Sequence, residues 1–251
     1  MTNALVVIPT YLEAANIETV LERVRAAVPD AHILVVDDSS PDGTAGIAES
    51  VGERIGLVDV LVRPTKTGLG DAYRAGMAWG LAHGFDVLVS MDADLSHDPA
   101  ALPDLLGACA AGADLVVGSR YIPGARIETS WPRRRRALSR WANRYVRVAL
   151  RSHVADNTAG FRAYRATLLN DIRLANSRAD GYAFQIETVY RALSIDAAIR
   201  EVPIVFTDRA AGHSKLSGRT IVEALVLVTW WGVRARLGRA AVELDPARTP
   251  G

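Results

Sequence analysis

Two aspartates behind one short apolar run carry the strongest chemical signal in the chain. Asp92 and Asp94 stand on either side of an alanine, just after the run Asp86–Val89. The loop after a strand can turn such carboxylates toward one point, where they repel each other unless a cation lies between them. Carboxylate oxygens suit Mg²⁺ or Mn²⁺, which commonly bridge protein oxygens and a substrate diphosphate. We therefore predict a divalent-metal site here. The alternative is an acidic loop that caps the helix beginning at Pro99, a role that Asp98 already fills.

A second acidic pair, Asp37 and Asp38, follows an earlier apolar run. Adjacent carboxylates at the end of a buried strand can accept hydrogen bonds from the ribose hydroxyls or the base edge of a nucleoside. The alternative is a plain turn, since residues 39–43 are rich in turn formers. Together with a metal pair on a neighbouring loop, the two acids favour a site for a nucleotide diphosphate.

The motifs of several other enzyme classes are missing from the sequence. Lys66–Gly70 precedes a helical pattern and could approach a phosphate, but it lacks the residue order of a Walker loop, and no G-x-G-x-x-G motif follows a strand. The five histidines show no zinc spacing. The single cysteine, Cys109, can form no internal disulfide, and its small apolar neighbours favour a buried, unreactive thiol. A dinucleotide-dependent dehydrogenase and a zinc hydrolase therefore lack support.

Short β-branched runs alternate with helical patterns through residues 1–120. The runs are Ala4–Ile8, His32–Val36, Val58–Val62, Asp86–Val89 and Asp114–Val117. Between the first two, apolar residues recur from Ile17 to Val28 at helical intervals. Ser40-Pro41 and Asp98-Pro99 each place a capping residue before a proline that suits the first turn of a helix. This alternation predicts an α/β fold with a mostly parallel central sheet and helices on both faces.

In such a sheet, ligands bind where the carboxyl ends of the strands open into loops. The polar residues behind four of the runs should therefore converge at one edge, namely Pro9–Glu13, Asp37-Asp38, Asp92–Asp94 and Ser119-Arg120. The sequence thus predicts a site of several carboxylates and one arginine at that edge.

The pattern changes from about Trp131 onward. We expect a helix over Arg133–Arg151 with arginines along one flank and an apolar side made of Leu138, Trp141, Tyr145 and Val148. After it we expect a helix near Ala183–Leu193, a strand near Ile199–Phe206 and a last helix over about Ser217–Leu237. No repeat or low-complexity linker divides the chain, so we predict one domain over residues 1–238 and a flexible tail over 239–251.

The net charge and the basic run indicate which kinds of partner the protein binds. The formal net charge is +1, so we do not expect nucleic-acid binding despite the basic run Arg133–Arg136. Anionic headgroups, or a phosphorylated acceptor at a membrane surface, fit those arginines better.

Trp230 and Trp231 beside Arg234 indicate either an interfacial anchor or a helix that packs on the domain. The longest apolar run, Ala224–Val233, has about half of the ~20 residues of a spanning helix, and no leader precedes the first run. We expect a cytoplasmic protein that is peripherally associated with the cytoplasmic face of the membrane.

Several segments of the chain resemble known enzymes. Val7–Glu13, Val35–Thr44, Met91–Pro99 and Gly118–Tyr121 resemble the inverting family 2 glycosyltransferases of the GT-A fold. Trp131–Asn143, Thr158–Tyr164, Gly181–Glu187 and Asp208–Leu216 are more specific and resemble the polyprenyl-phosphate (dolichyl-phosphate) β-D-mannosyltransferases. The resemblance covers about residues 3–238 and implies a Rossmann-like nucleotide-diphospho-sugar transferase fold. It implies that residues 1–120 bind nucleotide sugar and metal, and that residues 121–238 bind the acceptor with amphipathic helices. The implied reaction is metal-dependent, inverting transfer of mannose from GDP-mannose to a polyprenyl phosphate.

The resemblance also implies roles for individual residues. Those that match the nucleotide site are Pro9, Tyr11, Glu13, Val36, Asp38 and Ala93. Those that match the site for Mg²⁺ or Mn²⁺ are Asp92, Asp94 and Ser96. Arg209 and Lys215 match a mobile loop that closes over the donor diphosphate. Arg120, Arg135 and Ser139 match the residues that grip the acceptor phosphate, and with Asp94 they form the expected catalytic set.

Two positions depart from the family pattern. Leu12 stands where the family usually has asparagine, and Ser96 where many relatives have glutamine.

Three other functions stay open from the residues alone. They are a UDP-glucose-dependent polyprenyl-phosphate glucosyltransferase, a nucleotidyltransferase and a non-enzymatic scaffold at the membrane. Since no spanning helix is expected, peripheral contact or a membrane-protein partner would bring the chain to its acceptor.

Overall fold

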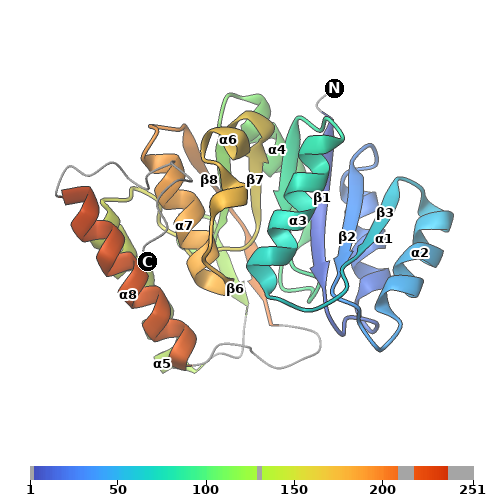
Figure 1. The fold of residues 1–251 in the computed structure, drawn as a ribbon, viewed down its shortest axis with the longest axis horizontal. Helices are drawn as coiled ribbons and strands as arrows, with labels where there is room; N and C mark the ends of the chain where they lie inside the picture. The colour runs from blue at the N-terminus through green and yellow to red at the C-terminus, as the bar shows by residue number, and fades with distance from the viewer. Residues whose placement is uncertain (1–2, 129–131, 209–217, 237–251) are drawn as a thin grey trace, which may run out of the picture.

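The computed structural model describes residues 3–128, 132–208 and 218–236 of the chain. Seven strands form one sheet in the order β3-β2-β1-β4-β7-β5-β8 (Figure 1). They are β1 Ala4–Thr10, β2 His32–Asp37, β3 Val58–Val62, β4 Val87–Ser90, β5 Leu115–Ser119, β7 Arg162–Arg165 and β8 Ile199–Pro203. All are parallel except β7, which runs antiparallel to both of its neighbours. The predicted α/β fold with a mostly parallel sheet is therefore confirmed.

Helices cover both faces of this sheet, as the alternating pattern predicts. On one face lie α1 Ile17–Ala27, α2 Thr44–Ile55 and α4 Leu102–Ala110, which pack on strand residues such as Val6 and Ile33. On the other face lie α3 Leu69–Ala82, α6 Ala166–Asp171 and α7 Gly181–Leu193, which pack on the alternate residues, such as Leu5 and Leu34. Because successive side chains of a strand point to opposite faces, nearly every residue of the central strands is buried.

Only one of the two predicted proline caps is present. The Asp98 side chain accepts a hydrogen bond of 3.0 Å from the Ala100 amide and caps the short 3₁₀ turn Pro99–Ala101. The prediction at Ser40-Pro41 is wrong, because α2 begins only at Thr44 and its cap residue is Gly43, with φ at 84°. A left-handed φ suits glycine, and the Ser40 hydroxyl instead donates to Asp37.

The antiparallel strand β7 comes from the later part of the chain, where the sequence shows only a glycine-containing segment. It lies between β4 and β5 and connects the two parts of the sheet. The expected halves 1–120 and 121–238 are therefore interleaved, since β7 and β8 complete the sheet that residues 1–120 begin.

The single strand expected near Ile199–Phe206 is divided in two. The first part, β8, pairs with β5 as far as Pro203, and the second part, β9 Val205–Thr207, pairs in parallel with β6 Arg126–Glu128. The change of partner occurs at Ile204, whose amide donates to Ser119 and whose carbonyl accepts from Arg126.

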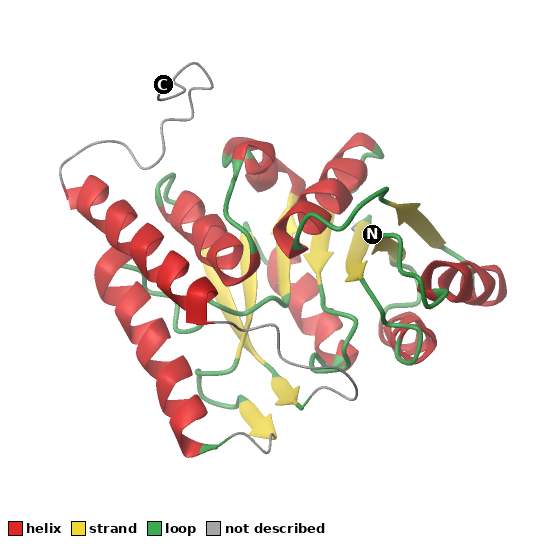
Figure 2. Ribbon diagram, turned by 60° about the horizontal axis from the view of Figure 1, so that its bottom comes forward, coloured by secondary structure: helices red, strands yellow, loops and turns green. Residues whose placement is uncertain are grey.

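Two long helices lie side by side at one end of the molecule (Figure 2). They are α5 Arg133–Leu150 and α8 Gly218–Arg236, and both pack against α7. The predicted apolar side of α5 is wrong as the buried face, because Leu138, Trp141 and Val148 are 43%, 50% and 66% exposed. The helix instead buries Val146 and Leu150, which the prediction did not include. The apolar arc of α5 is thus wider than the face that the fold buries.

Candidate active site

The polar residues behind the parallel strands converge at one edge of the sheet, as predicted. The strands β1, β2, β4 and β5 run in the same direction, so their carboxyl ends meet there. The Thr10 hydroxyl at the end of β1 donates to Asp37 at the end of β2, at 2.8 Å. The Glu13 amide donates to the Thr44 hydroxyl, at 3.1 Å. These bonds hold the first two loops together.

The two adjacent acids after β2 have different roles. Asp37 accepts hydrogen bonds from Ser40 through both carboxylate oxygens, which is the turn geometry considered as the alternative. Asp38 instead faces Arg63, with 3.1 Å between Oδ1 and Nη1, and both side chains are largely buried. Burial raises the pKa of Asp38 above its usual value, although the charge of Arg63 opposes the shift. Asp38 and Arg63 thus offer a carboxylate and a guanidinium to a polar ligand.

Three further residues of the expected nucleotide site lie at the end of β1 or in the core. Tyr11 lies beyond β1, and the ammonium of Lys66 stands 3.6 Å from its ring centroid. Glu13 accepts a hydrogen bond of 2.9 Å from Asn16. Val36 is fully buried in the core, against the face of α3 at Gly76. Its side chain therefore packs in the core between the sheet and α3, and its role at a nucleotide stays a prediction.

The predicted metal pair lies on the loop after β4. The Tyr73 hydroxyl of α3 donates to Asp92 Oδ1 at 2.7 Å. Asp94 Oδ1 accepts from the amide and the hydroxyl of Ser96, at 3.0 and 2.5 Å. Ser96 thus orients Asp94, and its place among the metal ligands stays a prediction.

These contacts fit a divalent cation. Each carboxylate is oriented through Oδ1 by a donor, and carboxylate oxygens are the hard ligands that Mg²⁺ and Mn²⁺ prefer. Among the residues that the structure describes, no group of three or more His, Cys, Asp or Glu side chains could hold a metal on its own. Mg²⁺ is commonly bound by one or two carboxylates together with substrate phosphates.

A buried histidine connects the metal loop to the other half of the site. His97 accepts a hydrogen bond from the Asp92 amide, at 3.3 Å, through Nδ1. Its ring stacks on Phe161 and meets Phe206 edge to face, with centroids 5.2 and 5.8 Å apart. Burial lowers the pKa of His97, although the nearby aspartates oppose the shift, so the ring is neutral at neutral pH. The neutral ring packs as an apolar group against the two phenylalanines.

Arg120 lies behind β5 and is held by a buried aspartate. Its Nε and Nη2 donate to the two carboxylate oxygens of Asp156 at 2.7 and 2.8 Å, and Nη2 also donates to the Thr158 hydroxyl at 2.9 Å. Burial would raise the pKa of Asp156, but the charge and hydrogen bonds of Arg120 outweigh it and lower that pKa. The pair is therefore ionised throughout the neutral range.

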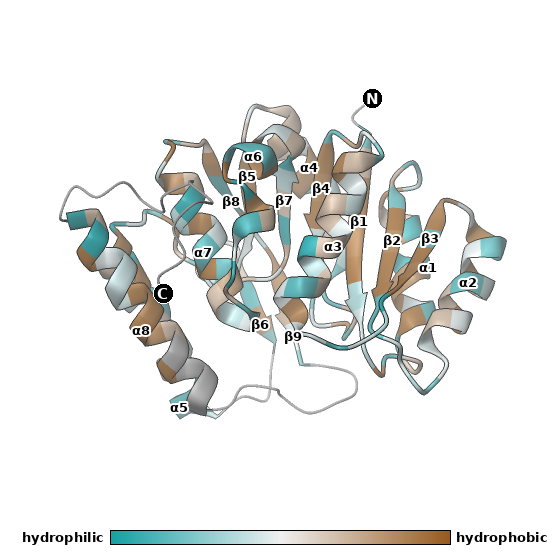
Figure 3. Cartoon of the chain, viewed as in Figure 1, coloured by the Kyte–Doolittle hydropathy of each residue, from teal (hydrophilic) through white to brown (hydrophobic). Residues whose placement is uncertain are grey.

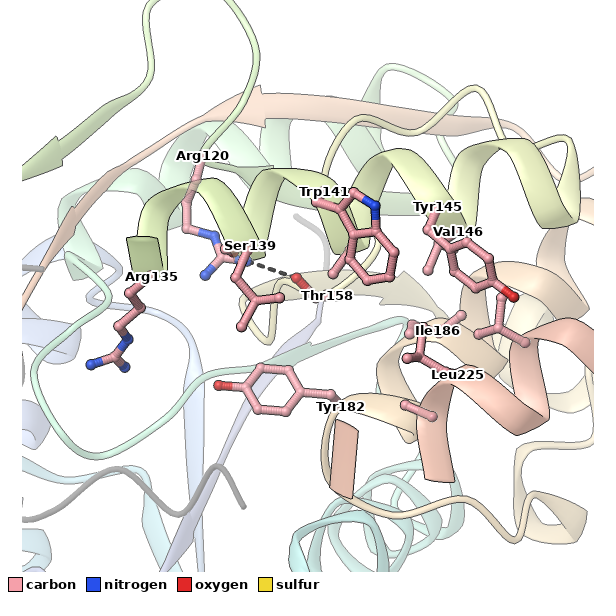
Figure 4. Close-up of a pocket in the computed structure, with 14 residues that line it drawn as sticks. Arg120, Arg135, Ser139, Trp141, Tyr145, Val146, Thr158, Tyr182, Ile186 and Leu225 are labelled. Atoms are coloured by element: carbon pink, nitrogen blue, oxygen red, sulfur yellow. Dashed lines mark hydrogen bonds between the residues drawn. The ribbon is translucent and has the colours of Figure 1, made fainter. Parts of the chain in front are cut away.

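The side chains of Arg120, Arg135 and Ser139 lie at one end of a groove between α5, α7 and α8 (Figure 4). The Ser139 hydroxyl is 2.7 Å from the Tyr121 hydroxyl. The rest of the groove is almost wholly apolar or aromatic, with Leu138, Trp141, Ala142, Tyr145, Val146, Tyr182, Ile186, Ala224, Leu225 and Val228 along it. The three residues matched to an acceptor phosphate thus lie together, with Arg135 and Ser139 one turn apart on α5 and Arg120 behind β5.

Two expected site residues cannot be placed. Arg209 and Lys215, matched to a loop over the donor diphosphate, lie outside the described residues.

Sequence reasoning missed several residues of the site. Tyr73, Asp156 and Tyr182 were given no role. Asp156 precedes the recognised segment Thr158–Tyr164 by two positions, so an acid beside that motif was the available signal. Tyr73 lies within an ordinary helical pattern, and nothing in its spacing distinguishes it from a core residue.

Comparisons with known proteins agree with this geometry. Residues 5–173 match the sequence family described as Glycosyl transferase family 2. The chain is 49% identical, over 94% of its length and 89% of the relative's, to a polyprenol monophosphomannose synthase of Mycolicibacterium smegmatis. It is 47% identical, over 92% of its length and 95% of the relative's, to an undecaprenyl-phosphate mannosyltransferase of Micrococcus luteus.

Solved structures share the fold at lower identity. Mannosyl-3-phosphoglycerate synthase from Rubrobacter xylanophilus aligns with a TM-score of 0.67 at 20% identity, over 99% of this chain and 79% of that one. Glucosyl-3-phosphoglycerate synthase from Mycobacterium tuberculosis, solved with Mn²⁺, UDP and phosphoglyceric acid, aligns with a TM-score of 0.64 at 22% identity, over 98% and 80%. The likeness confirms the predicted GT-A fold.

Proposed function

Because the chain belongs to glycosyl transferase family 2, we propose that it transfers mannose from GDP-mannose to a polyprenyl phosphate with inversion at the anomeric carbon. The product would be a polyprenyl-phosphate β-mannose. The two relatives named for polyprenol and undecaprenyl phosphate support the sugar and the acceptor. The guanine nucleotide and the inversion rest on the resemblance of the motifs.

The groove between α5, α7 and α8 is the observation that carries the proposal. A polyprenyl phosphate has a doubly charged head and a long apolar tail. The groove offers two arginines and a serine at one end and apolar side chains along the rest (Figure 4). Arginine forks suit phosphate oxygens, and an apolar wall suits isoprene units. An acceptor that attacked through a sugar hydroxyl would have no use for that apolar wall.

The reaction needs no strong general base from the protein. A phosphate monoester has a second pKa of about 6, so the acceptor oxygens are mostly ionised at neutral pH. The residues Arg120, Arg135 and Ser139 would hold that phosphate in line with the anomeric carbon and offset its repulsion from the donor. A bond forms between a phosphate oxygen and the anomeric carbon on the face opposite the donor. The bond from that carbon to the diphosphate breaks, and GDP leaves with the electron pair.

Asp92 and Asp94 would hold the divalent cation, either Mg²⁺ or Mn²⁺. When bound, such an ion supplies positive charge to the departing diphosphate. Tyr73 orients Asp92 and Ser96 orients Asp94, so the carboxylates are prepared before the donor binds. The Mn²⁺ in a fold neighbour supports this assignment.

The nucleotide itself would bind at the edge formed by the β1 and β2 loops. Pro9, Tyr11, Glu13 and Asp38 lie there, with Val36 and Ala93 buried beneath. Asp38 can accept from the base edge, and Arg63 beside it can donate. Arg209 and Lys215 would close over the diphosphate.

Contact with the membrane is the second part of the proposal. Val222, Val226, Trp230 and Val233 form one stripe along α8 and are 49–62% exposed. Figure 3 shows hydrophobic residues along this helix. The arginine flank of α5 is exposed as well, and it suits anionic headgroups. Within the described residues, no helix combines the length and apolarity that crossing a bilayer requires. We propose peripheral association, directly or through a membrane-protein partner, at the cytoplasmic face.

The experiment that tests the function is a donor competition. Purified protein, a short polyprenyl phosphate and Mg²⁺ or Mn²⁺ are incubated with labelled GDP-mannose or UDP-glucose, and label extracted into organic solvent is counted. Metal-dependent label from GDP-mannose alone is the expected result. Label from UDP-glucose would replace the sugar and keep the acceptor. No lipid-borne label from either donor would refute the acceptor assignment.

A further inference from the structure

The guanidinium of Arg120 is held along one edge by a carboxylate with no solvent exposure. Asp156 is fully buried and receives three hydrogen bonds from Arg120, from the main-chain N at 3.1 Å, from Nε at 2.7 Å and from Nη2 at 2.8 Å. Because Nη2 also donates to Thr158, Nε and Nη2 are both occupied by protein. Within the described part of the chain, Nη1 is the side-chain nitrogen of Arg120 that is left to donate to a ligand in the groove.

Two aromatic rings lie close to the same guanidinium. Its central carbon lies 5.2 Å from the ring centroid of Phe206 and 5.5 Å from that of Tyr121. A planar group held along one edge and flanked by two rings has little rotational freedom. The direction in which Nη1 points is therefore set before any ligand binds.

Asp156 is itself fixed by a frame of hydrogen bonds. Glu201 of β8 accepts from the amides of Ala155 and Asp156 at 2.8 and 3.1 Å. Asn143 of α5 accepts from the Asn157 amide, at 2.8 Å. The loop that carries Asp156 is thus tied to the sheet on one side and to α5, a wall of the groove, on the other.

We propose that Asp156 is a positioning residue for the acceptor: it locks Arg120 so that Nη1 meets the phosphate of the polyprenyl phosphate at a fixed place. The inference rests on the proposed function, because it needs the acceptor phosphate to bind at Arg120. Binding energy is then not spent on ordering the arginine when the acceptor arrives.

Positioning and simple electrostatics predict opposite signs for one substitution. Asp156 carries a negative charge close to the place of a doubly charged phosphate. If charge alone mattered, Asp156→Asn would remove a repulsion and lower the KM for polyprenyl phosphate. If Asp156 positions Arg120, the same change releases the guanidinium, since an amide cannot accept from both Nε and Nη2. The acceptor KM then rises by about 10-fold or more, the size of effect expected when a charge-assisted hydrogen bond is lost.

The experiment compares Asp156→Asn, Arg120→Ala and the double variant by steady-state kinetics with a short polyprenyl phosphate and GDP-mannose. We expect both single variants to raise the acceptor KM and to leave the donor KM within about two-fold. We also expect the double variant to be no worse than Arg120→Ala, since effects that pass through one group are not additive. An unchanged or lower acceptor KM in Asp156→Asn would overturn the inference, as would additive losses in the double variant.

Glu201→Gln is the matched control, because Glu201 holds the same loop without touching Arg120. If Asp156 served only the fold of the loop, Glu201→Gln would change the acceptor KM as much as Asp156→Asn does. Removing one member of a buried ion pair can prevent folding. Asp156→Glu keeps the charge but displaces the guanidinium, so in a chain that still binds GDP-mannose it should raise the acceptor KM too. If Arg120→Ala itself leaves the acceptor KM unchanged, the placement of the acceptor fails, and not only the role of Asp156.

Discussion

Replacing Tyr73 with phenylalanine tests the metal site with very little change to the core. Tyr73 is fully buried, and its hydroxyl donates to Asp92 Oδ1 at 2.7 Å. Its ring stacks on Phe184 with centroids 6.0 Å apart and planes 5° apart, and a phenylalanine would keep that packing. Burial and the nearby charge of Asp92 raise the pKa of Tyr73 well above its usual value, so the phenol stays a donor at every pH of assay. The substitution therefore removes one hydrogen bond to a carboxylate and little else.

The expected effect is a loss of metal affinity. Without the phenol, the Asp92 carboxylate can rotate. Ordering it again when the ion binds then reduces the binding free energy of the ion. Outer-shell partners of metal ligands are worth about 10- to 100-fold in affinity, which corresponds to about 1.4 to 2.8 kcal/mol. A carboxylate oxygen that no longer accepts a hydrogen bond also has a lone pair available for the cation. We expect the loss of orientation to outweigh that gain, because the ion needs both carboxylates at one point.

The assay is a titration of Mn²⁺ in the presence of GDP, followed by the electron paramagnetic resonance signal of the unbound ion. Tyr164→Phe is the matched control, since the Tyr164 hydroxyl is also buried but has no hydrogen-bond partner among the described residues. It should leave the affinity for Mn²⁺ unchanged. Asp94→Asn should abolish both binding and transfer. Equal affinities of wild type and Tyr73→Phe would refute the reasoning, and normal turnover by Asp94→Asn would refute the metal site.

Three other predictions concern the acceptor site, the helix pair and the thiol. Arg135→Ala should raise the KM for polyprenyl phosphate by about ten-fold and spare that for GDP-mannose, since a charge-assisted bond contributes ~1.4 kcal/mol or more; the reverse pattern would contradict the phosphate placement. Gly232→Ala would put a Cβ atom 2.6 Å from the Ala149 carbonyl oxygen, so α8 must move from α5. Thermal unfolding should show a loss of about 1 to 3 kcal/mol, and an unchanged melting temperature would argue against this helix contact. Burial raises the pKa of Cys109 to about 11, so its alkylation at pH 8 should be slow in the native protein and rapid after unfolding.

The sequence alone determined the parallel part of the sheet and the edge at which the polar residues behind the strands gather. β-branched runs of four or five residues, separated by helical patterns, are typical of parallel strands that are covered by helices on both faces. The direction of those strands then brings the loops at Asp38, Asp92 and Arg120 to one edge. These inferences held because they depend on local periodicity and on a general rule of sheet geometry.

Long-range pairing was beyond the reach of that reasoning. The strand β7 is short and carries two arginines, Arg162 and Arg165, so its sequence does not look like a central strand. Arg162 is nevertheless fully buried, because Gln185, Thr188 and Asn157 accept its hydrogen bonds. Only the assembled fold provides those partners, so the burial of such a residue cannot be read from the chain.

The same distinction applies to the site. The types of the residues that would bind metal and phosphate, such as Asp94 and Arg135, could be recognised in the sequence because their chemistry is carried by the side chain itself. The groove between α5, α7 and α8, and the grip of Asp156 on Arg120, were decided by the tertiary structure. A groove exists only between elements that have packed, and the direction of a guanidinium depends on neighbours that are distant along the chain.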